Sequence, residues 1–244
     1  MVFIHGNSDK AVGTSLSRSG FSTSIQHFLK NGYRPSELYA TTWGPVDALQ
    51  SSQQYHSRAH LTRVRAFLQA VLDYTGAAQI DVIGHSMGVT LLRKAVQGGP
   101  ASDLLAGGDY DLGPSLAPRV DTFVGIAGSN RGLTLCYTSP AVPTCGATNG
   151  FYPGTMIGLL GPYGVSRFLD DINTSGRREG RYIYSVWSTA DEVIGGGDLV
   201  WGRFTSQIPG QDGELRLSGI PYGHMNSKNL TVEQQLRMVR DHQP

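Results

Sequence analysis

Hydrophobic residues along the chain follow two spacings, one typical of strands and one typical of helices. Short apolar or alternating runs predict strands over residues 1–4, 38–42, 80–83, 120–127, 181–187 and 214–218. Apolar positions three and four apart predict helices over 24–31, 52–75, 87–97, 165–172 and 231–241. Because strands and helices alternate, we expect an α/β fold with a mostly parallel sheet and helices on both faces.

Two of these helices carry further detail. The apolar stripe of the helix over 52–75 leaves Arg58, Arg63 and Arg65 outside it, so these guanidinium groups are expected on the solvent side. Thr231 followed by Gln234 matches a capping box, which predicts that the last helix begins with reciprocal side-chain caps.

The length and composition fit one domain over residues 1–244. No shift in composition marks a linker, and 32 glycines with only 16% charged residues indicate a chain rich in turns. Basic and acidic residues number 20 and 19, so the net charge of +1 argues against a nucleic-acid partner. No apolar run is long enough to predict a transmembrane segment, and we expect a monomer.

The two cysteines, Cys136 and Cys145, lie in one irregular segment with no histidine or further cysteine nearby. This spacing argues against a zinc site and favours a disulfide that closes a short loop. Two unrelated thiols are the alternative. A disulfide implies an oxidising compartment, yet the first predicted strand begins at Met1 with no signal peptide before it. We therefore expect a secreted protein in mature or trimmed form, with a cytosolic protein holding reduced thiols as the alternative.

The stretch Gly84-His85-Ser86-Met87-Gly88 joins the buried strand over 80–83 to a predicted helix. This G-x-S-x-G pattern is typical of a nucleophile elbow, a sharp turn that lifts a serine hydroxyl off the backbone. The flanking glycines leave room for the neighbouring elements, and the helix N-terminus adds a partial positive charge. Ser86 is therefore the candidate nucleophile, and an ordinary strand-to-helix turn is the alternative.

Among the seven histidines, His224 is the candidate base because it follows the last predicted strand late in the chain. The alternative for His224 is a surface or core histidine without a catalytic role. His85 lies inside the elbow itself. His56 and His60 are four residues apart and could pair on a metal, but without a nearby carboxylate ligand we expect a solvated helix face and no metal site.

The acid that orients the base is expected after a strand between the serine and the histidine, which selects Asp191. Glu192 and Asp198 are the alternatives. The backbone N–H groups of Met87, next after the nucleophile, and Asn7, in the first loop, are the candidate oxyanion donors.

The order Ser86, Asp191, His224 is that of the α/β-hydrolases. The chain resembles the class 2 lipases, minimal bacterial α/β-hydrolases without a separate cap domain. Four landmarks besides the elbow carry the resemblance: Phe3-Ile4-His5-Gly6-Asn7, Gly128-Ser129-Asn130-Arg131, Ser188-Thr189-Ala190-Asp191 and Gly223-His224. The resemblance implies hydrolysis of carboxylic or triacylglycerol esters with no cofactor.

Two departures from that pattern concern the substrate. Val89 follows the elbow where a second glycine is frequent, and it slightly fills the space behind the turn. The segments at about 100–118 and 131–180 are longer than in minimal lipases and resemble insertions of extracellular polyester (polyhydroxyalkanoate) depolymerases. A polyester depolymerase is therefore the alternative enzyme, and a non-catalytic binding protein on a hydrolase fold is the alternative of another class.

The loops at the carboxyl ends of the strands supply apolar side chains for the walls of a substrate pocket. An aliphatic ester or lipid, met in solution or at an interface, is the expected substrate. Glycine and proline are dense over 146–164, so this stretch is expected to be a mobile partial lid. The candidate substrate-binding residues are Leu135, Met156, Leu159, Leu160, Val193, Ile194 and Met225.

Overall fold

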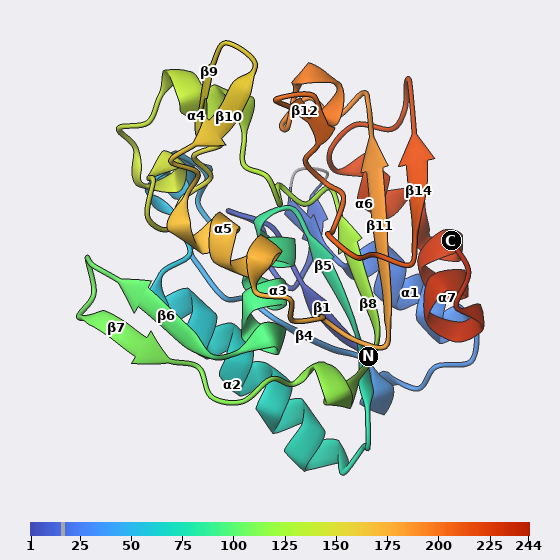
Figure 1. The fold of residues 1–244 in the computed structure, drawn as a ribbon. Helices are drawn as coiled ribbons and strands as arrows, with labels where there is room; N and C mark the ends of the chain where they lie inside the picture. The colour runs from blue at the N-terminus through green and yellow to red at the C-terminus, as the bar shows by residue number, and fades with distance from the viewer. Residues whose placement is uncertain (16–17) are drawn as a thin grey trace.

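The computed structural model describes residues 1–15 and 18–244 and contains a central sheet of six strands. The strands lie in the order β14-β11-β8-β5-β1-β4, and every neighbouring pair is parallel. Their bounds are Val2–Ile4 for β1, Tyr39–Thr41 for β4, Ile80–His85 for β5, Val120–Ile126 for β8, Tyr182–Ser188 for β11 and Gly213–Leu217 for β14. The parallel sheet is confirmed, and the carboxyl ends of its strands meet at one edge, at the top of Figure 1.

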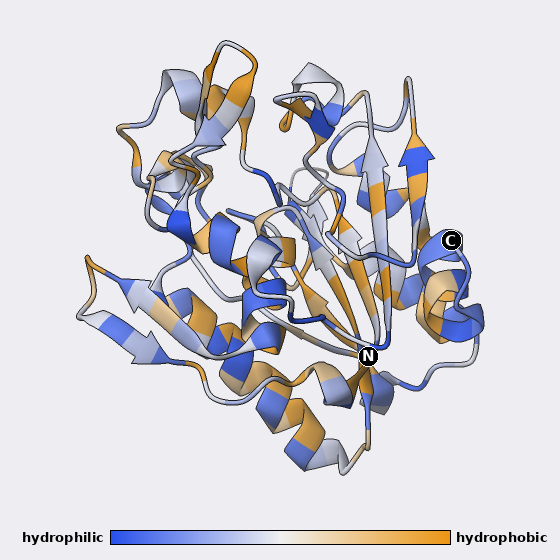
Figure 2. Ribbon diagram, in the orientation of Figure 1, coloured by the Kyte–Doolittle hydropathy of each residue, from blue (hydrophilic) through white to orange (hydrophobic). Residues whose placement is uncertain are grey.

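Helices cover both faces of this sheet, because its strands bury side chains on alternate sides. Val82 of β5 belongs to a core shared with α2 and α3, whereas the adjacent Ile83 belongs to a core shared with α1 and α7. The central strands are accordingly hydrophobic in Figure 2. The helices are α1 (Ser22–Lys30), α2 (Arg58–Thr75), α3 (Met87–Gln97), α4 (Thr134–Thr138), α5 (Arg167–Thr174), α6 (Asn226–Asn229) and α7 (Val232–Asp241).

The long helix begins later than its apolar pattern predicts. The 3-10 helix η2 (Ala48–Gln53) precedes it, and α2 begins after Ser57, whose side chain accepts a hydrogen bond from the His60 N–H. Arg65 is buried on α2, which corrects the expected solvent position, because its guanidinium donates to the carbonyl oxygens of Ala95 and Pro114. These two acceptors lie on distant segments that a helical pattern does not show, and the buried Arg65 Nε has no partner within the described residues.

The capping box predicted for the last helix does not form. Thr231 is the residue before α7, but its hydroxyl donates to the Ser227 carbonyl of the preceding α6 and does not cap α7. The short helix α6 therefore competes for the side chain that the pattern assigned to the cap.

Small hairpins and 3-10 helices lie in the segments that connect the elements of the central sheet. The segment at about 100–118 forms the antiparallel pair β6–β7, and the segment over 131–180 holds α4, the pair β9–β10 and α5. In Figure 1, β9 and β10 rise on the side opposite β14. No helix in the described residues is both long and apolar enough to span a bilayer. The remaining elements are β2 (Val12–Ser15), β3 (Arg18–Gly20), η1 (Pro35–Glu37), β6 (Pro100–Asp103), β7 (Gly108–Asp111), η3 (Ala117–Arg119), η4 (Pro143–Cys145), β9 (Thr155–Ile157), β10 (Leu160–Tyr163), η5 (Gly196–Asp198), β12 (Leu199–Val200) and β13 (Arg203–Phe204).

Candidate active site

Ser86 occupies a sharp turn between β5 and α3. Its φ of 55° and ψ of −131° fall in a region that residues with a side chain rarely adopt, which indicates local strain. The Ser86 N–H donates to the Ile126 carbonyl at 2.8 Å, so the next strand, β8, holds the turn. A side chain at Gly84 would have its Cβ 3.0 Å from the Val89 Cα, and one at Gly88 would collide with the His5 carbonyl oxygen. The sequence therefore needs both glycines for this turn.

Val89 fills the space behind the turn, and glycines on the facing segment accommodate it. Its Cγ1 would lie 2.9 Å from a Cβ at Gly125 and 2.8 Å from a Cβ at Gly128. Val89, which stands where a second glycine is frequent, is thus accommodated by glycines at and just after the end of β8.

The first loop passes directly beside the elbow. A Cβ at Gly6 would lie 2.8 Å from the Ser86 Cβ, so only glycine allows this approach. The backbone N–H groups of Asn7 and Met87 donate no hydrogen bond within the described residues. Met87 is the first residue of α3, where N–H groups have no helical partner. Both candidate oxyanion donors therefore remain available to a ligand.

His224 and Asp191 are brought together across 33 positions of sequence. The His224 Nδ1 lies 2.7 Å from the Asp191 Oδ2, and both side chains are almost fully buried. The Asp191 Oδ1 accepts hydrogen bonds from the N–H groups of Val193 and Ile194 at 2.9 Å. This carboxylate is therefore fixed on both oxygens, and an imidazole in contact with it presents Nε2 as the free ring nitrogen. Within the described residues, the Ser86 hydroxyl makes no hydrogen bond to His224, and hydrogen bonds between nucleophile and base often tighten only when a substrate binds.

The two alternative acids have other contacts. The Glu192 Oε2 accepts a hydrogen bond from the His224 backbone N–H at 2.9 Å and does not contact the ring nitrogen. Asp198 is buried and bonds Ser206, with its Oδ1 accepting from the Ser206 hydroxyl at 2.6 Å. Burial raises the pKa of Asp198 to about 6. Of the three carboxylates, Asp191 alone meets the imidazole.

Cys136 and Cys145 form a disulfide, as expected, and it joins α4 to η4 within the inserted segment. His56 differs from the prediction of a solvated helix face, because it precedes α2 and is fully buried. Its Nδ1 lies 2.7 Å from the Asn149 carbonyl oxygen, its Nε2 lies 2.7 Å from the Thr90 hydroxyl, and burial lowers its pKa to about 3. The described residues contain no cluster of three or more His, Cys, Asp or Glu side chains that could hold a metal ion.

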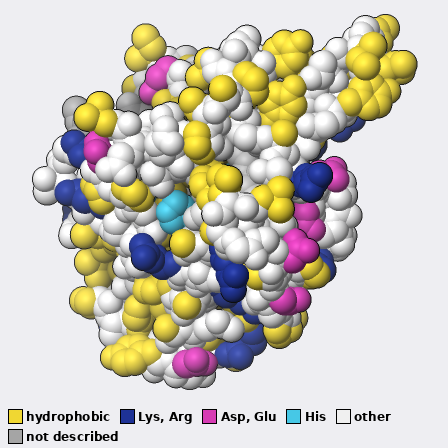
Figure 3. All heavy atoms as spheres, turned by 90° about the vertical axis from the view of Figure 1, so that its left-hand side faces the viewer, with side chains coloured by type: hydrophobic (Ala, Val, Ile, Leu, Met, Phe, Trp, Pro, Cys, Tyr) yellow, Lys and Arg dark blue, Asp and Glu magenta, His cyan; other side chains and the backbone are white. Residues whose placement is uncertain are grey.

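The predicted apolar walls are partly exposed. Leu135 on α4, Leu159 between β9 and β10, and Val193 after Asp191 are 65%, 98% and 56% exposed, respectively. Ile194 is instead buried in the core with α1 and α7, so its side chain is not an open wall. Figure 3 shows hydrophobic side chains gathered along the upper edge of the molecule and on its projecting corner. The other candidates are the exposed Leu160 and the half-buried Met156 and Met225.

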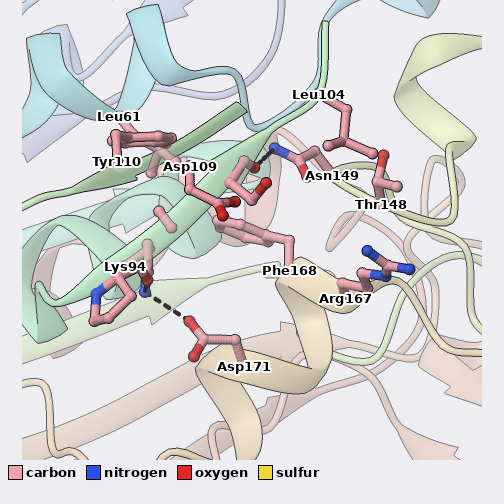
Figure 4. A pocket seen from close by; sticks show the side chains of 13 residues that line it. Leu61, Lys94, Leu104, Asp109, Tyr110, Thr148, Asn149, Arg167, Phe168 and Asp171 are labelled. Atoms are coloured by element: carbon pink, nitrogen blue, oxygen red, sulfur yellow. Dashed lines mark hydrogen bonds and ion pairs between the residues drawn. The ribbon is translucent and has the colours of Figure 1, made fainter. Parts of the chain in front are cut away.

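A separate cavity of about 380 Å³ lies between the β6–β7 hairpin and α5 (Figure 4). Phe168 and Leu104 supply apolar surface, and Arg167 stands at its side. The Lys94 ammonium and the Asp171 carboxylate form an ion pair of 2.6 Å at the opposite wall. None of the lining residues belongs to the predicted site, so this cavity is a competing location for a ligand.

Comparison with known proteins places the chain in a sequence family and shows which solved structures share its fold. A family model described as Lipase (class 2) matches residues 1–237. One of two metagenome-derived lipolytic enzymes, LipS and LipT, is 16% identical with a TM-score of 0.53, over 99% of this chain and 93% of that one. A monoacylglycerol lipase from Paleococcus ferrophilus is 11% identical with a TM-score of 0.52, over 96% and 92% of the two chains. An extracellular α/β-hydrolase from a Paenibacillus species is 12% identical with a TM-score of 0.50, over 97% of each.

These identities are low, so the likeness to solved structures concerns the fold, which is that of the α/β-hydrolases. No curated protein sequence matches the chain.

Proposed function

The chain belongs to the class 2 lipase family, and we propose that it is a serine carboxylesterase or lipase that hydrolyses aliphatic acyl esters through an acyl-enzyme. The contact of 2.7 Å between His224 and Asp191 carries this proposal. A buried imidazole oriented by a fixed carboxylate is the arrangement that turns a serine into a nucleophile. Ser86, on its strained turn, is the proposed nucleophile.

In the proposed reaction, the Ser86 Oγ attacks the ester carbonyl carbon while its proton moves to the His224 Nε2. The tetrahedral oxyanion accepts hydrogen bonds from the N–H groups of Met87 and Asn7. The imidazolium then gives its proton to the departing alcohol oxygen, which leaves an acyl group on Ser86. Water attacks that acyl group with His224 as the base, and the carboxylic acid is released.

An aliphatic acyl group is the proposed substrate because the candidate walls present carbon surface. Leu135, Leu159 and Val193 are exposed and carry no charge, and burying an aliphatic chain against them is favourable by roughly 0.8 kcal/mol per methylene. The β9–β10 hairpin is proposed to border the acyl site as a partial lid and to meet lipid at an interface. The disulfide between Cys136 and Cys145 supports secretion as the proposed location.

Turnover of p-nitrophenyl butyrate tests the proposal. We expect hydrolysis by the wild-type protein and a kcat lowered by roughly 10⁴–10⁶ in Ser86→Ala and His224→Ala, because nucleophile and base act as a unit. Asp191→Asn should lower kcat by about 10⁴. Full activity of Ser86→Ala would refute the proposal, and a greater loss in Glu192→Gln or Asp198→Asn than in Asp191→Asn would refute the acid assignment. Tributyrin and a polyester film, assayed alongside, distinguish a lipase from a polyester depolymerase.

A further inference from the structure

His224 is held by its backbone as well as by its ring. Its N–H donates to the Glu192 Oε2 at 2.9 Å, and its carbonyl oxygen lies 3.1 Å from the His85 Nε2. We propose that Glu192 and His85 are positioning residues that clamp the main chain of His224 and thereby aim its ring at Ser86. This inference rests on the proposed function, in which His224 is the base.

The two carboxylates that contact His224 are neighbours in sequence, and one contacts its ring while the other contacts its backbone. Asp191 is buried and contacts the ring, whereas Glu192 is exposed on its outer side and turns Oε2 toward the backbone. A side chain at Gly223 would collide with that Oε2, so the glycine before the histidine leaves the space that this carboxylate fills. One turn after β11 therefore fixes both the ring and the peptide N–H of His224.

His85 contacts the backbone carbonyl group of His224. A carbonyl oxygen only accepts hydrogen bonds, so the His85 Nε2 carries the proton, and the unprotonated Nδ1 is the buried atom that lacks a partner within the described residues. Burial, with the positive charge of Lys228, keeps the pKa of His85 well below its ordinary value. A neutral ring is needed here, because the His85 and His224 rings are 4.7 Å apart and a second cation would oppose protonation of the base.

The geometry gives the clamp a catalytic consequence. The loop that carries His224 runs from β14 to the four-residue α6, so no long element fixes it from within. The ring must reach Ser86 to within a hydrogen bond, and a displacement of about 1 Å can cost about 10²-fold in rate. Hydrogen bonds to N–H and C=O on either side restrict that displacement without touching substrate, so losing either one is expected to lower kcat and leave KM unchanged.

The test compares conservative and disruptive variants at both positions, with p-nitrophenyl butyrate. Glu192→Gln keeps an oxygen acceptor, and we expect its kcat within about threefold of wild type. Glu192→Ala removes the acceptor, and we expect kcat about tenfold lower with KM within twofold. His85→Gln keeps a nitrogen donor and should retain more kcat than His85→Leu. Glu233→Ala, an exposed carboxylate paired with His27, is the matched control and should behave as wild type.

Thermal unfolding of each variant separates a misplaced base from a damaged fold, and Glu192→Ala on the surface tests the clamp even where His85→Leu fails to fold. If Glu192→Ala matches the control, or Glu192→Gln falls as far as Glu192→Ala, the clamp is refuted. If the clamp is refuted in either way but Ser86→Ala loses activity, the proposed function is still supported. Wild-type activity in Ser86→Ala would instead refute the function on which the clamp depends.

Discussion

The indole of Trp43 lies nearly parallel to the imidazole of His5, with ring centroids 5.3 Å apart, and its Nε1 donates a hydrogen bond to the His5 carbonyl oxygen at 2.7 Å. The Trp43 backbone N–H also donates to the His5 Nε2 at 3.3 Å. Trp43 is buried just after β4, so this edge of the sheet anchors the first loop two residues before Asn7. No motif in the sequence marks Trp43 for this role.

Trp43→Phe keeps an aromatic ring and removes the donor to His5. Leaving that buried carbonyl without its partner should lower the free energy of unfolding by about 1–3 kcal/mol, measured by urea titration. We expect kcat for p-nitrophenyl acetate to fall about tenfold at unchanged KM, because the Asn7 N–H is held less firmly for the oxyanion. Trp201→Phe removes an indole donor to Pro153 on the inserted segment and should keep kcat. An equal fall in both variants would show that the first loop has no special part in the rate.

The buried Asp198 predicts a pH dependence of stability. Its folded pKa of about 6 exceeds the unfolded value of about 3.9, so the folded state binds the extra proton between these values. Stability from this group is therefore present below pH 4 and lost as the pH rises through 6, by about 3 kcal/mol in total.

Asp198→Asn tests this directly, because an amide can still bond Ser206 and cannot ionise. Its unfolding free energy should exceed that of the wild type at pH 7.5 and approach it at pH 4.5. A constant difference between the two proteins across that range would contradict the ionisation of Asp198 as the cause.

The disulfide between Cys136 and Cys145 closes a short loop, and the chain-entropy model gives it a stabilisation of about 2–3 kcal/mol. The double variant Cys136→Ser with Cys145→Ser should lose about that much unfolding free energy. Alkylation of the unreduced wild-type protein should label no cysteine by mass spectrometry. Two labelled cysteines would contradict the bridge and remove the main support for secretion.

The apolar β9–β10 hairpin should affect long acyl chains selectively. Replacing Leu159 and Leu160 with serine is expected to raise KM for p-nitrophenyl decanoate severalfold and to leave the acetate ester unchanged, with stability within about 0.5 kcal/mol because both leucines are exposed. Leu105→Ser, at an equally open turn between β6 and β7, is the matched control. An equal or larger effect at Leu105 would contradict a selective role of the hairpin, and equal effects on both esters would remove the hairpin from the acyl site.

Periodicity predicted the elements that carry the site, because β5 and α3 owe their form to local spacing and to the glycines around Ser86. It failed where a polar side chain finds its partner far along the chain. Arg65 and His56 are buried beside carbonyl acceptors of Pro114 and Asn149, and no local pattern contains those pairs. Short hairpins such as β6–β7 lack the length that makes alternation visible.

Within the site, too, the sequence did not predict every contact between residues that are far apart along the chain. The position directly after a predicted strand favoured Asp191 over Glu192. In the structure both carboxylates contact His224, Asp191 at the ring and Glu192 at the backbone. These contacts depend on the turn after β11 and on the missing side chain at Gly223. The roles inferred for Glu192 and His85 follow from three-dimensional contacts alone.

Labelling with a fluorophosphonate ester, followed by peptide mass spectrometry, tests the central claim most directly, because such reagents phosphonylate a serine that a neighbouring histidine has activated. We predict one adduct per chain, on the peptide that contains Ser86, with labelling abolished in Ser86→Ala and strongly slowed in His224→Ala and Asp191→Asn. Stoichiometric labelling of any other residue, or an adduct that persists in Ser86→Ala, would contradict the account.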